Sequence, residues 1–399
     1  MSIPLSRKAL ALTSASALAV ATLAIGASSA IADEADSSSE LSTVLGVDNP
    51  DKIHGEYIVQ LNSELSTMNM ESVADDFDAA IFSEFELFNG FAAQMSHADA
   101  EALAAHSDVN FVEQNSAVDV AAGPGEQEDP PSWGLDRIDQ RSGPLDGLYT
   151  YPNTALTISA YVMDTGINTS HVDFEGRIGN GYDAIDDGDI EDCQGHGTAV
   201  SGVIGGTEHG VAKDVTIHPV RVLDCDGSGS MDGVIGGIEW IVDDADGVAI
   251  ANASLGAPAD ASLDAAVNAA VDAGIFFVAA AGSSADDACN YSPAGAEAAF
   301  VFGSTDMSDS IGSGSNVGPC VDMFAPGVDI TVPWIDGDDS TSTMSGSSLG
   351  AAHGAGAAAM VLRDNPDFSP AEIGTWLTEN ATSIDGPEGP VGLLYVWED

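Results

Sequence analysis

The sequence predicts an α/β protein whose main domain is a doubly wound parallel sheet with helices on both faces, preceded by a small α+β domain. From Trp133 onward, four runs of continuous apolar residues occupy residues 155–164, 215–224, 247–256 and 274–282. Uninterrupted apolar runs are typical of strands buried on both faces of a parallel sheet. Ala- and Gly-rich helical stretches at residues 231–242 and 260–273 lie between them. This alternation of strands and helices favours the doubly wound architecture.

The small α+β domain is predicted over about residues 56–120, within a leading segment that extends from residue 33 to residue 129. Its expected elements follow the βαββαβ order of ferredoxin-like domains. They are a strand at 57–61, a helix at 68–82, a strand pair at 85–95 that turns at Asn89 and Gly90, a helix at 97–106 and a strand at 109–115. Gly, Pro and acidic residues follow at 121–132. They predict an exposed, cleavable linker before the main domain at residues 130–399.

The first 32 residues are interpreted as a secretory signal peptide. Arg7 and Lys8 precede an apolar run at residues 9–27, and Ala30-Ile31-Ala32 follows as an Ala-x-Ala cleavage motif. A membrane anchor is the alternative, although Ser and Thr interrupt the apolar run. Every later apolar run is too short to cross a bilayer. We therefore expect a secreted, extracellular protein that has no membrane contact once the signal is removed.

The charge of the chain excludes one class of partner. Nine Lys and Arg stand against 64 Asp and Glu, which gives a formal net charge of −55. Phosphate binding needs clustered bases, so nucleic acid is not expected as a partner. Chains this acidic are often disordered, but 44% hydrophobic residues indicate a folded core. From residue 130 onward the chain has 42 acids and six bases. Because salt screens like-charge repulsion, we expect the stability of this part to need salt.

Four cysteines follow the signal segment, namely Cys193, Cys225, Cys289 and Cys320. An even number of cysteines in an exported chain predicts two disulfides, for which three pairings are possible. Buried free thiols are the alternative. The sequence contains neither CxxC nor HExxH, so the cysteine spacing argues against a zinc site.

Three short motifs carry side chains that together suit nucleophilic catalysis. Asp164 ends an apolar strand, His196 opens an apolar helix within Gly195-His196-Gly197, and Ser348 opens another within Gly346-Ser347-Ser348. The carboxyl ends of parallel strands meet at one edge of a sheet, which is where such folds place their chemistry. A hydrolase of this type needs a nucleophile, a base and a group that orients the base. Asp, His and Ser in this chain order form one of the known triad orders.

These motifs resemble the subtilisin-like serine proteases, nearest to the proteinase K branch. The resemblance rests on VMDTGI, GHGT, SGSSLGAAH, YSPA, DMFAPG and WGLDRIDQR, whose order and spacing are specific together. Residues 56–120 resemble the inhibitor I9-type propeptide of this family through GEYIVQL, NGFAAQMS and VEQNSAV. The resemblance implies a subtilisin-like fold and a zymogen that processes itself. It also implies that the propeptide inhibits the enzyme until it is cut away.

The resemblance also implies roles for single residues. Ser348 is the expected nucleophile, His196 the general base and acid, and Asp164 the residue that orients His196. The backbone N–H of Ser348 is one expected oxyanion donor. Two segments are expected to pair with an extended peptide or protein substrate, and they comprise Ser228, Gly229, Ser230, Ser254, Leu255 and Gly256. Pairing through backbone groups implies a broad specificity with an apolar pocket, and the enzyme is expected to be a monomer.

The sequence departs from the family pattern around the expected oxyanion site. Ser283 stands where the family has an Asn that supplies the second oxyanion donor, and removal of one such donor lowers turnover about 10²–10³-fold in enzymes of this kind. Leu349 and Ala352 also replace a Met and a Pro of the family motif. A weakly active or non-catalytic relative that binds peptide or retains its propeptide is therefore the alternative hypothesis. None of these changes removes a reacting atom.

Disulfide pairs and calcium sites are implied by the resemblance alone. The implied pairs are Cys193–Cys225 and Cys289–Cys320. Structural Ca²⁺ is implied at two sites, and no organic cofactor is expected. The first site would comprise Asp322 with the backbone carbonyls of Glu297 and Ala299. The second would comprise Asp136, Asp139, Gln140 and Asp146, although Leu148 stands where an Asn ligand is expected. Solvated surface acids are the alternative at both sites.

Overall fold

The structure is a computed structural model that describes residues 44–47, 52–62, 73–74, 77, 79–85, 87–116, 124–185, 188–387 and 389–397. The predicted signal peptide at residues 1–32 lies outside the described residues. Within the described ranges, no helix combines the length and the apolar character that a membrane crossing requires.

The small N-terminal module is a four-stranded antiparallel sheet with the strand order β2-β3-β1-β4. Its elements are β1 (Lys52–Leu61), β2 (Ala80–Phe85), β3 (Gly90–Gln94), α2 (His97–Ala104) and β4 (Val109–Ser116). Alternate β1 residues such as Tyr57 and Val59 are fully buried against α2. The predicted helix at 68–82 is wrong at its end, because residues 80–82 are strand and pair with β3. Residues 68–72 of that prediction lie outside the described residues.

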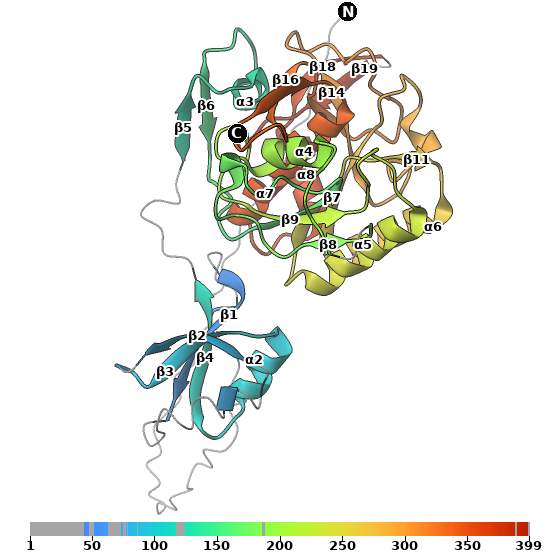
Figure 1. The fold of residues 1–399 in the computed structure, drawn as a ribbon. Helices are drawn as coiled ribbons and strands as arrows, with labels where there is room; N and C mark the ends of the chain where they lie inside the picture. The colour runs from blue at the N-terminus through green and yellow to red at the C-terminus, as the bar shows by residue number, and fades with distance from the viewer. Residues whose placement is uncertain are drawn as a thin grey trace, which may run out of the picture. The chain divides into compact units, whose positions relative to one another are not determined.

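The main domain contains a nine-stranded sheet, which confirms the predicted fold class (Figure 1). The strand order is β18-β19-β15-β14-β12-β10-β7-β9-β8, and every neighbouring pair is parallel except β18 with β19. The four predicted apolar runs form its central strands, β7 (Ser159–Asp164), β9 (Thr216–Arg221), β10 (Ala249–Ala253) and β12 (Ile275–Ala280). The outer strands are β8 (Tyr182–Asp183), β14 (Phe300–Thr305), β15 (Met323–Pro326), β18 (Thr382–Gly386) and β19 (Gly389–Leu393).

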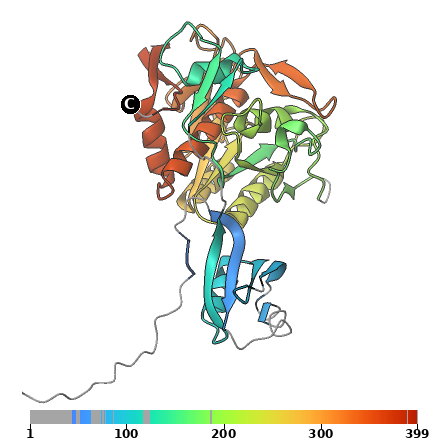
Figure 2. The same cartoon turned by 90° about the vertical axis from the view of Figure 1, so that its left-hand side faces the viewer.

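Helices cover both faces of this sheet, as Figures 1 and 2 show. One core contains side chains from α3 (Trp133–Ile138), α4 (His196–Gly205), α7 (Ser347–Asp364) and α8 (Pro370–Asn380). The core on the other face contains side chains from α5 (Met231–Asp244) and α6 (Ala261–Asp272). Smaller elements lie in the connections: η1 (Val172–Phe174), β11 (Ala257–Pro258), η2 (Ala288–Asn290), β13 (Tyr291–Ser292), β16 (Ile330–Pro333) and β17 (Thr341–Met344).

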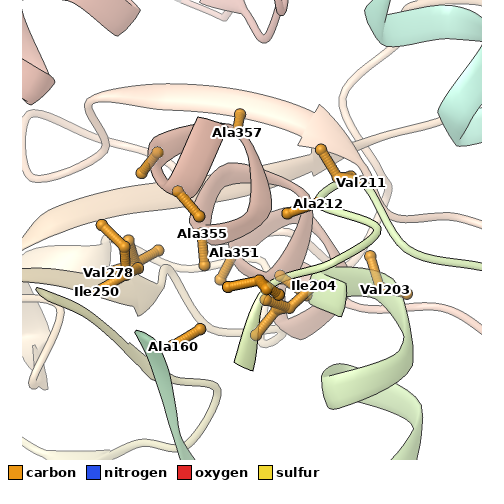
Figure 3. Packing of buried hydrophobic residues seen from close by; sticks show 14 of the residues in the cluster. Ala160, Val203, Ile204, Val211, Ala212, Ile250, Val278, Ala351, Ala355 and Ala357 are labelled. Atoms are coloured by element: carbon orange, nitrogen blue, oxygen red, sulfur yellow. The ribbon is translucent and has the colours of Figure 1, made fainter. Parts of the chain in front are cut away.

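Helix α7 lies close against the sheet because nine of its 18 residues are Ala or Gly. Ala351 and Ala355 are fully buried and point toward Ile250 and Val278 of the central strands (Figure 3). A Cβ atom at Gly350 would lie 2.4 Å from the carbonyl oxygen of Gly303, and one at Gly354 would lie 2.2 Å from the ring of Phe302. Both glycines therefore permit a close approach that positions the N-terminus of α7.

The predicted linker at 121–132 is only partly irregular. Residues 117–123 lie outside the described residues, but β5 (Gly125–Glu128) pairs antiparallel with β6 (Leu148–Tyr151). Three of the four β5 residues are polar or charged. No apolar pattern predicts this strand, because backbone pairing to β6 holds it in place.

Candidate active site

Asp164 and His196 are brought together by the end of a central strand and the start of a helix. Asp164 is the last residue of β7 and is completely buried. Its backbone carbonyl accepts hydrogen bonds from the backbone N–H groups of Val222 and Leu223, at 3.0 and 3.1 Å. His196 is the first residue of α4, and its side chain is 22% exposed. The predicted placement of both residues at the carboxyl edge of the sheet is thus observed.

The His196 imidazole is hydrogen-bonded to the buried carboxylate of Asp164. Nδ1 of His196 lies 2.8 Å from Oδ1 and 2.9 Å from Oδ2 of Asp164. Burial lowers the pKa of His196, but the charge and hydrogen bond of Asp164, together with the charge of Asp192, outweigh it, so the pKa is raised above 6.5. A carboxylate at Nδ1 fixes the tautomer that leaves Nε2 available as a base. The pair therefore supplies a base and the group that orients it.

Asp192 anchors this arrangement, although sequence reasoning missed it. Its Oδ1 accepts from the backbone N–H of Gly195 at 2.8 Å, and its Oδ2 accepts from the backbone N–H of Thr198 at 2.9 Å. Gly195, at φ +106°, has no side chain that could cap α4, and the free N–H groups of the first turn are satisfied from outside the helix by Asp192, Gln194 and Thr165. The Thr165 hydroxyl donates to Asp192 and accepts from Gly197 N–H, so it links the end of β7 to the start of α4. The acid lies four residues before His196, which is the only signal the sequence offers.

Ser348 lies in the first turn of α7 and contacts the strand end after β10. Its hydroxyl donates to the backbone carbonyl of Ser254 at 3.3 Å, and the Ser254 hydroxyl donates back to the carbonyl of Ser348 at 3.0 Å. Asn252, which is buried, donates to the Ser254 hydroxyl at 2.9 Å. These bonds fix the nucleophile candidate beside one of the predicted substrate-binding segments.

A cavity of about 270 Å³ opens beside Ser348. Small residues form most of its walls, both apolar and polar, and its lining comprises Ser254, Leu255, Gly256, Ala280, Ala281, Gly282, Ser283, Ser284, Tyr291, Ser292, Ala294, Asn316, Ser347 and Ser348. The predicted oxyanion residue Ser283 and the predicted substrate residues 254–256 thus lie around one space. The other predicted segment, Ser228, Gly229 and Ser230, is exposed, and Ser230 also caps α5 through a bond from Gly233 N–H.

The Ser283 hydroxyl is close to the N-terminus of α7. It accepts from the backbone N–H of Ser347 at 3.3 Å and lies 3.4 Å from the Ser347 hydroxyl oxygen. The Ser347 hydroxyl in turn accepts from Gly282 N–H at 3.0 Å. Gly346 precedes the helix without a capping side chain. Ser283 therefore supplies an acceptor to the first turn of α7 from a separate loop.

Both disulfides implied by the resemblance are present. Cys193 and Cys225 are joined with their Cα atoms 5.0 Å apart, and Cys289 and Cys320 with theirs 5.3 Å apart. The first disulfide links the loop before His196 to the segment before Ser228. The second links the loop after Ser283 to the start of β15. Each disulfide thus constrains a loop that borders the candidate site.

The residues of the second implied calcium site lie together. Asp136 accepts from the backbone N–H groups of Asp146 and Gly147, and Oδ2 of Asp139 accepts from Thr150. Oδ1 of Asp139 is buried without a hydrogen-bond partner. Burial, together with the charges of Asp136 and Asp146, raises the pKa of Asp139 to about 6 against the lowering effect of the bonds from Thr150. The unpartnered Oδ1 is an oxygen ligand of the kind that a hard cation takes, but it is only one of the several such an ion needs.

The other donors fit calcium less well. Gln140 uses its amide NH₂ to donate to the carbonyls of Ser142 and Pro144. At the first implied site, Asp322 accepts from Val301 N–H at 2.8 Å and lines a cavity of about 580 Å³ with Glu297 and Ala299. Burial raises the pKa of Asp322, although the bond from Val301 lowers it. Among the residues that the structure describes, no group of three or more His, Cys, Asp or Glu is arranged as a metal site.

Comparison with known proteins identifies similar chains. Residues 157–393 match the model of the subtilase family, and residues 56–121 match that of peptidase inhibitor I9. An extracellular serine proteinase of Thermus sp. (strain Rt41A) is 47% identical over 273 residues, which cover 67% of each chain. Alkaline serine exoprotease A of Vibrio alginolyticus is 43% identical over 343 residues, which cover 84% of this chain and 62% of that protein. This chain thus spans less than two thirds of the Vibrio relative.

A solved structure shows the same fold. The crystal structure of a cold adapted subtilisin-like serine proteinase superposes with a TM-score of 0.65 and 46% sequence identity, covering 67% of this chain and 98% of that chain.

Proposed function

The chain belongs to the subtilase family of serine endopeptidases, and on that premise we propose that it is a secreted, self-processing endopeptidase of broad, apolar-preferring specificity. The observation that carries the proposal is the buried Asp164–His196 pair, at 2.8 Å, at the same sheet edge as Ser348 and its cavity. The names of the relatives support an active protease over a non-catalytic one.

The proposed reaction proceeds through an acyl-enzyme. The Ser348 hydroxyl leaves its resting bond to Ser254, transfers its proton to Nε2 of His196 and attacks the substrate carbonyl carbon. The imidazolium then gives this proton to the leaving amine nitrogen, so that the peptide bond breaks and an ester to Ser348 remains. A water molecule cleaves the ester by the same route. Asp164 stays ionised throughout and stabilises the imidazolium.

The proposed oxyanion donors are the backbone N–H of Ser348 and the hydroxyl of Ser283. A hydroxyl has one hydrogen to donate and two lone pairs to accept with. The Ser283 oxygen accepts from Ser347 N–H and lies within reach of the Ser347 hydroxyl. Either hydroxyl can donate in the 3.4 Å contact, and when the Ser347 hydroxyl donates, Ser283 keeps its own hydrogen for a developing oxyanion. This arrangement compensates in part for the shorter reach of Ser compared with Asn.

The proposed substrate is an extended peptide or protein segment that pairs with residues 228–230 and 254–256. Exposed backbone at Ser228 and Gly229 suits such pairing. Ala280, Ala281 and Leu255 in the cavity wall suit an apolar side chain. The I9-like segment is proposed to inhibit the enzyme until it is cut away near residues 121–132, after export by the signal peptide at 1–32. A monomer is proposed for the mature enzyme.

Structural calcium is proposed at the Asp136, Asp139 and Asp146 group, which fits a hard cation better than the Asp322 site does. A bound cation would neutralise the mutual repulsion of these carboxylates and supply no chemistry to the reaction. Removing calcium with a chelator is expected to lower the thermal midpoint of the Ser348→Ala protein, which cannot digest itself. Asp139→Asn is expected to abolish this dependence, and Asp272→Asn, at an exposed helical acid, to preserve it. Equal chelator sensitivity in both variants would contradict the site.

The proposed function is tested by mass analysis of the purified secreted protein. The parent is expected to lack residues up to about 121–132 and to hydrolyse peptides, whereas Ser348→Ala should keep its propeptide. Ser345→Ala, three residues earlier and exposed, is the matched control and should mature normally. A parent that retains its propeptide contradicts the proposal and supports the weakly active alternative. Activity gained by Ser283→Asn would then locate the defect at the oxyanion site.

A further inference from the structure

Asn316 lies beneath the loop that carries Ser283, and sequence reasoning did not single it out. The residue is completely buried. Its Nδ2 donates to the carbonyl oxygen of Ala281 at 2.9 Å, and its Oδ1 accepts from the backbone N–H groups of Ser284 and Asp286, both at 3.0 Å. One side chain therefore holds three backbone groups of the loop at residues 281–286.

The backbone of Asn316 adds a fourth hydrogen bond to the loop at residues 281–286. Its N–H donates to the carbonyl oxygen of Gly282 at 2.8 Å. The Gly282 carbonyl belongs to the peptide group before Ser283, and the Ser284 N–H belongs to the peptide group after it. Both peptide groups that flank Ser283 are thus bonded to Asn316.

The loop and Asn316 also fit each other sterically. Gly282 has a φ of +100°, which favours glycine, and a Cβ atom there would lie 2.4 Å from Nδ2 of Asn316. A side chain at position 282 would therefore displace Asn316 or the loop. Because the Ser283 hydroxyl is only one carbon from the backbone, any shift of the loop moves that hydroxyl by a similar distance.

We propose that Asn316 is a positioning residue that holds the Ser283 hydroxyl where it can donate to the oxyanion. The inference rests on the proposed function and assigns a role to a residue that contacts neither the nucleophile nor the base. Ser283 itself is held on its other side by the Ser347 N–H. The position of the hydroxyl is therefore fixed from two sides, by Asn316 through the loop backbone and by the first turn of α7.

The test compares kcat in a double-mutant cycle. Asn316→Asp keeps an acceptor for Ser284 and Asp286 but places a carboxylate oxygen against the Ala281 carbonyl. The repulsion should displace the loop and with it the Ser283 hydroxyl. This displacement is expected to lower kcat roughly 10–100-fold, with a smaller change in KM. In the Ser283→Ala background, where the donor is already absent, the same substitution is expected to change kcat by less than about threefold. An equal penalty in both backgrounds would overturn the inference.

Asn153 provides a matched control. It is also a buried Asn that bonds two backbone groups, donating to Met360 O at 3.0 Å and accepting from Ala155 N–H at 2.8 Å. Asn153→Asp is expected to lower the thermal midpoint but to leave kcat near the parent value. If it lowers kcat as Asn316→Asp does, the effect is general destabilisation and the inference fails.

A second readout does not require turnover. In the full-length Ser348→Ala chain, Asn316→Ala is expected to speed hydrogen exchange of the Ser284 and Asp286 amides, and Asn153→Asp should not. Unchanged exchange at both amides contradicts the positioning role. If the Asn316 variants do not fold, Gly282→Ala disturbs the same contact from the loop side and is expected to show the same loss. An inactive, unprocessed parent contradicts the proposed function instead, so the two failures are distinguishable.

Discussion

Two Asp–His pairs flank helix α4, and they have the same geometry in different surroundings. His196 begins the helix and lies 2.8 Å from Asp164, whereas His209 follows the helix and lies 2.9 Å from Asp173. Both aspartates are buried. His196 is 22% exposed, but His209 is 9% exposed and its Nε2 is buried without a hydrogen-bond partner. The difference teaches that orientation by a carboxylate does not distinguish the two imidazoles, whereas exposure does: only His196 is open enough to serve as the proposed base.

The largest expected effect comes from removing each histidine. His196→Ala should lower kcat by about 10⁶-fold, the size of loss that enzymes of this family show without their base. His209→Ala should leave kcat within a few-fold of the parent and lower the thermal midpoint, because it leaves the buried Asp173 without its partner. Steady-state kinetics and thermal unfolding of both variants check this. A loss of kcat in His209→Ala as large as that in His196→Ala would remove the distinction between the pairs.

The aspartates give the next largest effect. Asp164→Asn should lower kcat by about 10⁴-fold, because an amide donor at this position favours the wrong tautomer of His196. Asp173→Asn should instead destabilise the fold by about 1.5–3 kcal/mol, the usual contribution of a hydrogen bond to a charged group, because the carboxylate bonded to His209 and to Glu208 N–H is lost. Denaturant unfolding of both variants in the Ser348→Ala background measures the stability, and kcat of each in the active enzyme completes the comparison. A normal kcat in Asp164→Asn would contradict the triad.

The pH dependence of activity should separate the pairs further. A base must be neutral to accept a proton, so kcat/KM is expected to fall tenfold per pH unit below the pKa of His196. Because that pKa is raised above 6.5, the acid limb should lie above pH 6.5. Asp164→Asn removes the main cause of the raised His196 pKa and leaves the lowering effect of burial. The acid limb of kcat/KM in this variant should therefore move to lower pH. Asp173→Asn, as the control, should leave the limb in place, and a shift there would show that the pairs are coupled.

The proposed triad residues could be picked out from sequence because each lies in a short motif at the end of an apolar strand or the start of an apolar helix. Asp192 and Asn316 could not be predicted in this way. Each is a single polar residue in a loop, and its partners are backbone groups that only the folded chain brings near. Asn316 acts on residues that precede it by about 30 positions, and no local periodicity carries that information.

The helix predicted at 68–82 failed at its end for a different reason. Residues 80–85 read AIFSEF, and their alternating exposure is that of an edge strand. Pairing of this strand with β3 decides its conformation, and local propensity does not contain that tertiary contact. Gly350 shows the converse case, because a residue that weakens a helix in isolation is required where α7 meets the Gly303 carbonyl.

The Asp173–His209 pair should affect how the stability of the fold depends on pH. Burial raises the pKa of Asp173, but the bonds from His209 and Glu208 N–H and the charges of His209 and His171 outweigh it, so the pKa lies below 3.8. A lowered pKa contributes stability above the unfolded value of 3.8, and this contribution is lost as the pH falls through the folded pKa. In the Ser348→Ala background, the parent should therefore lose more stability on acidification than Asp173→Asn does. Parallel loss in the two proteins would mean that Asp173 is not ionised in the fold.

The smallest expected effect concerns salt, and it tests whether both pairs are insulated from the acidic surface. Sodium chloride should raise the thermal midpoint of the Ser348→Ala protein, because it screens repulsion among the many surface acids. Buried pairs are screened much less than surface charges. The increase should therefore be nearly the same in Ser348→Ala and in Ser348→Ala with His209→Ala, when unfolding is followed from low ionic strength to molar salt. If His209→Ala cancels the increase, the salt effect acts through the Asp173–His209 pair. If salt stabilises neither protein, repulsion among the surface acids does not destabilise the fold.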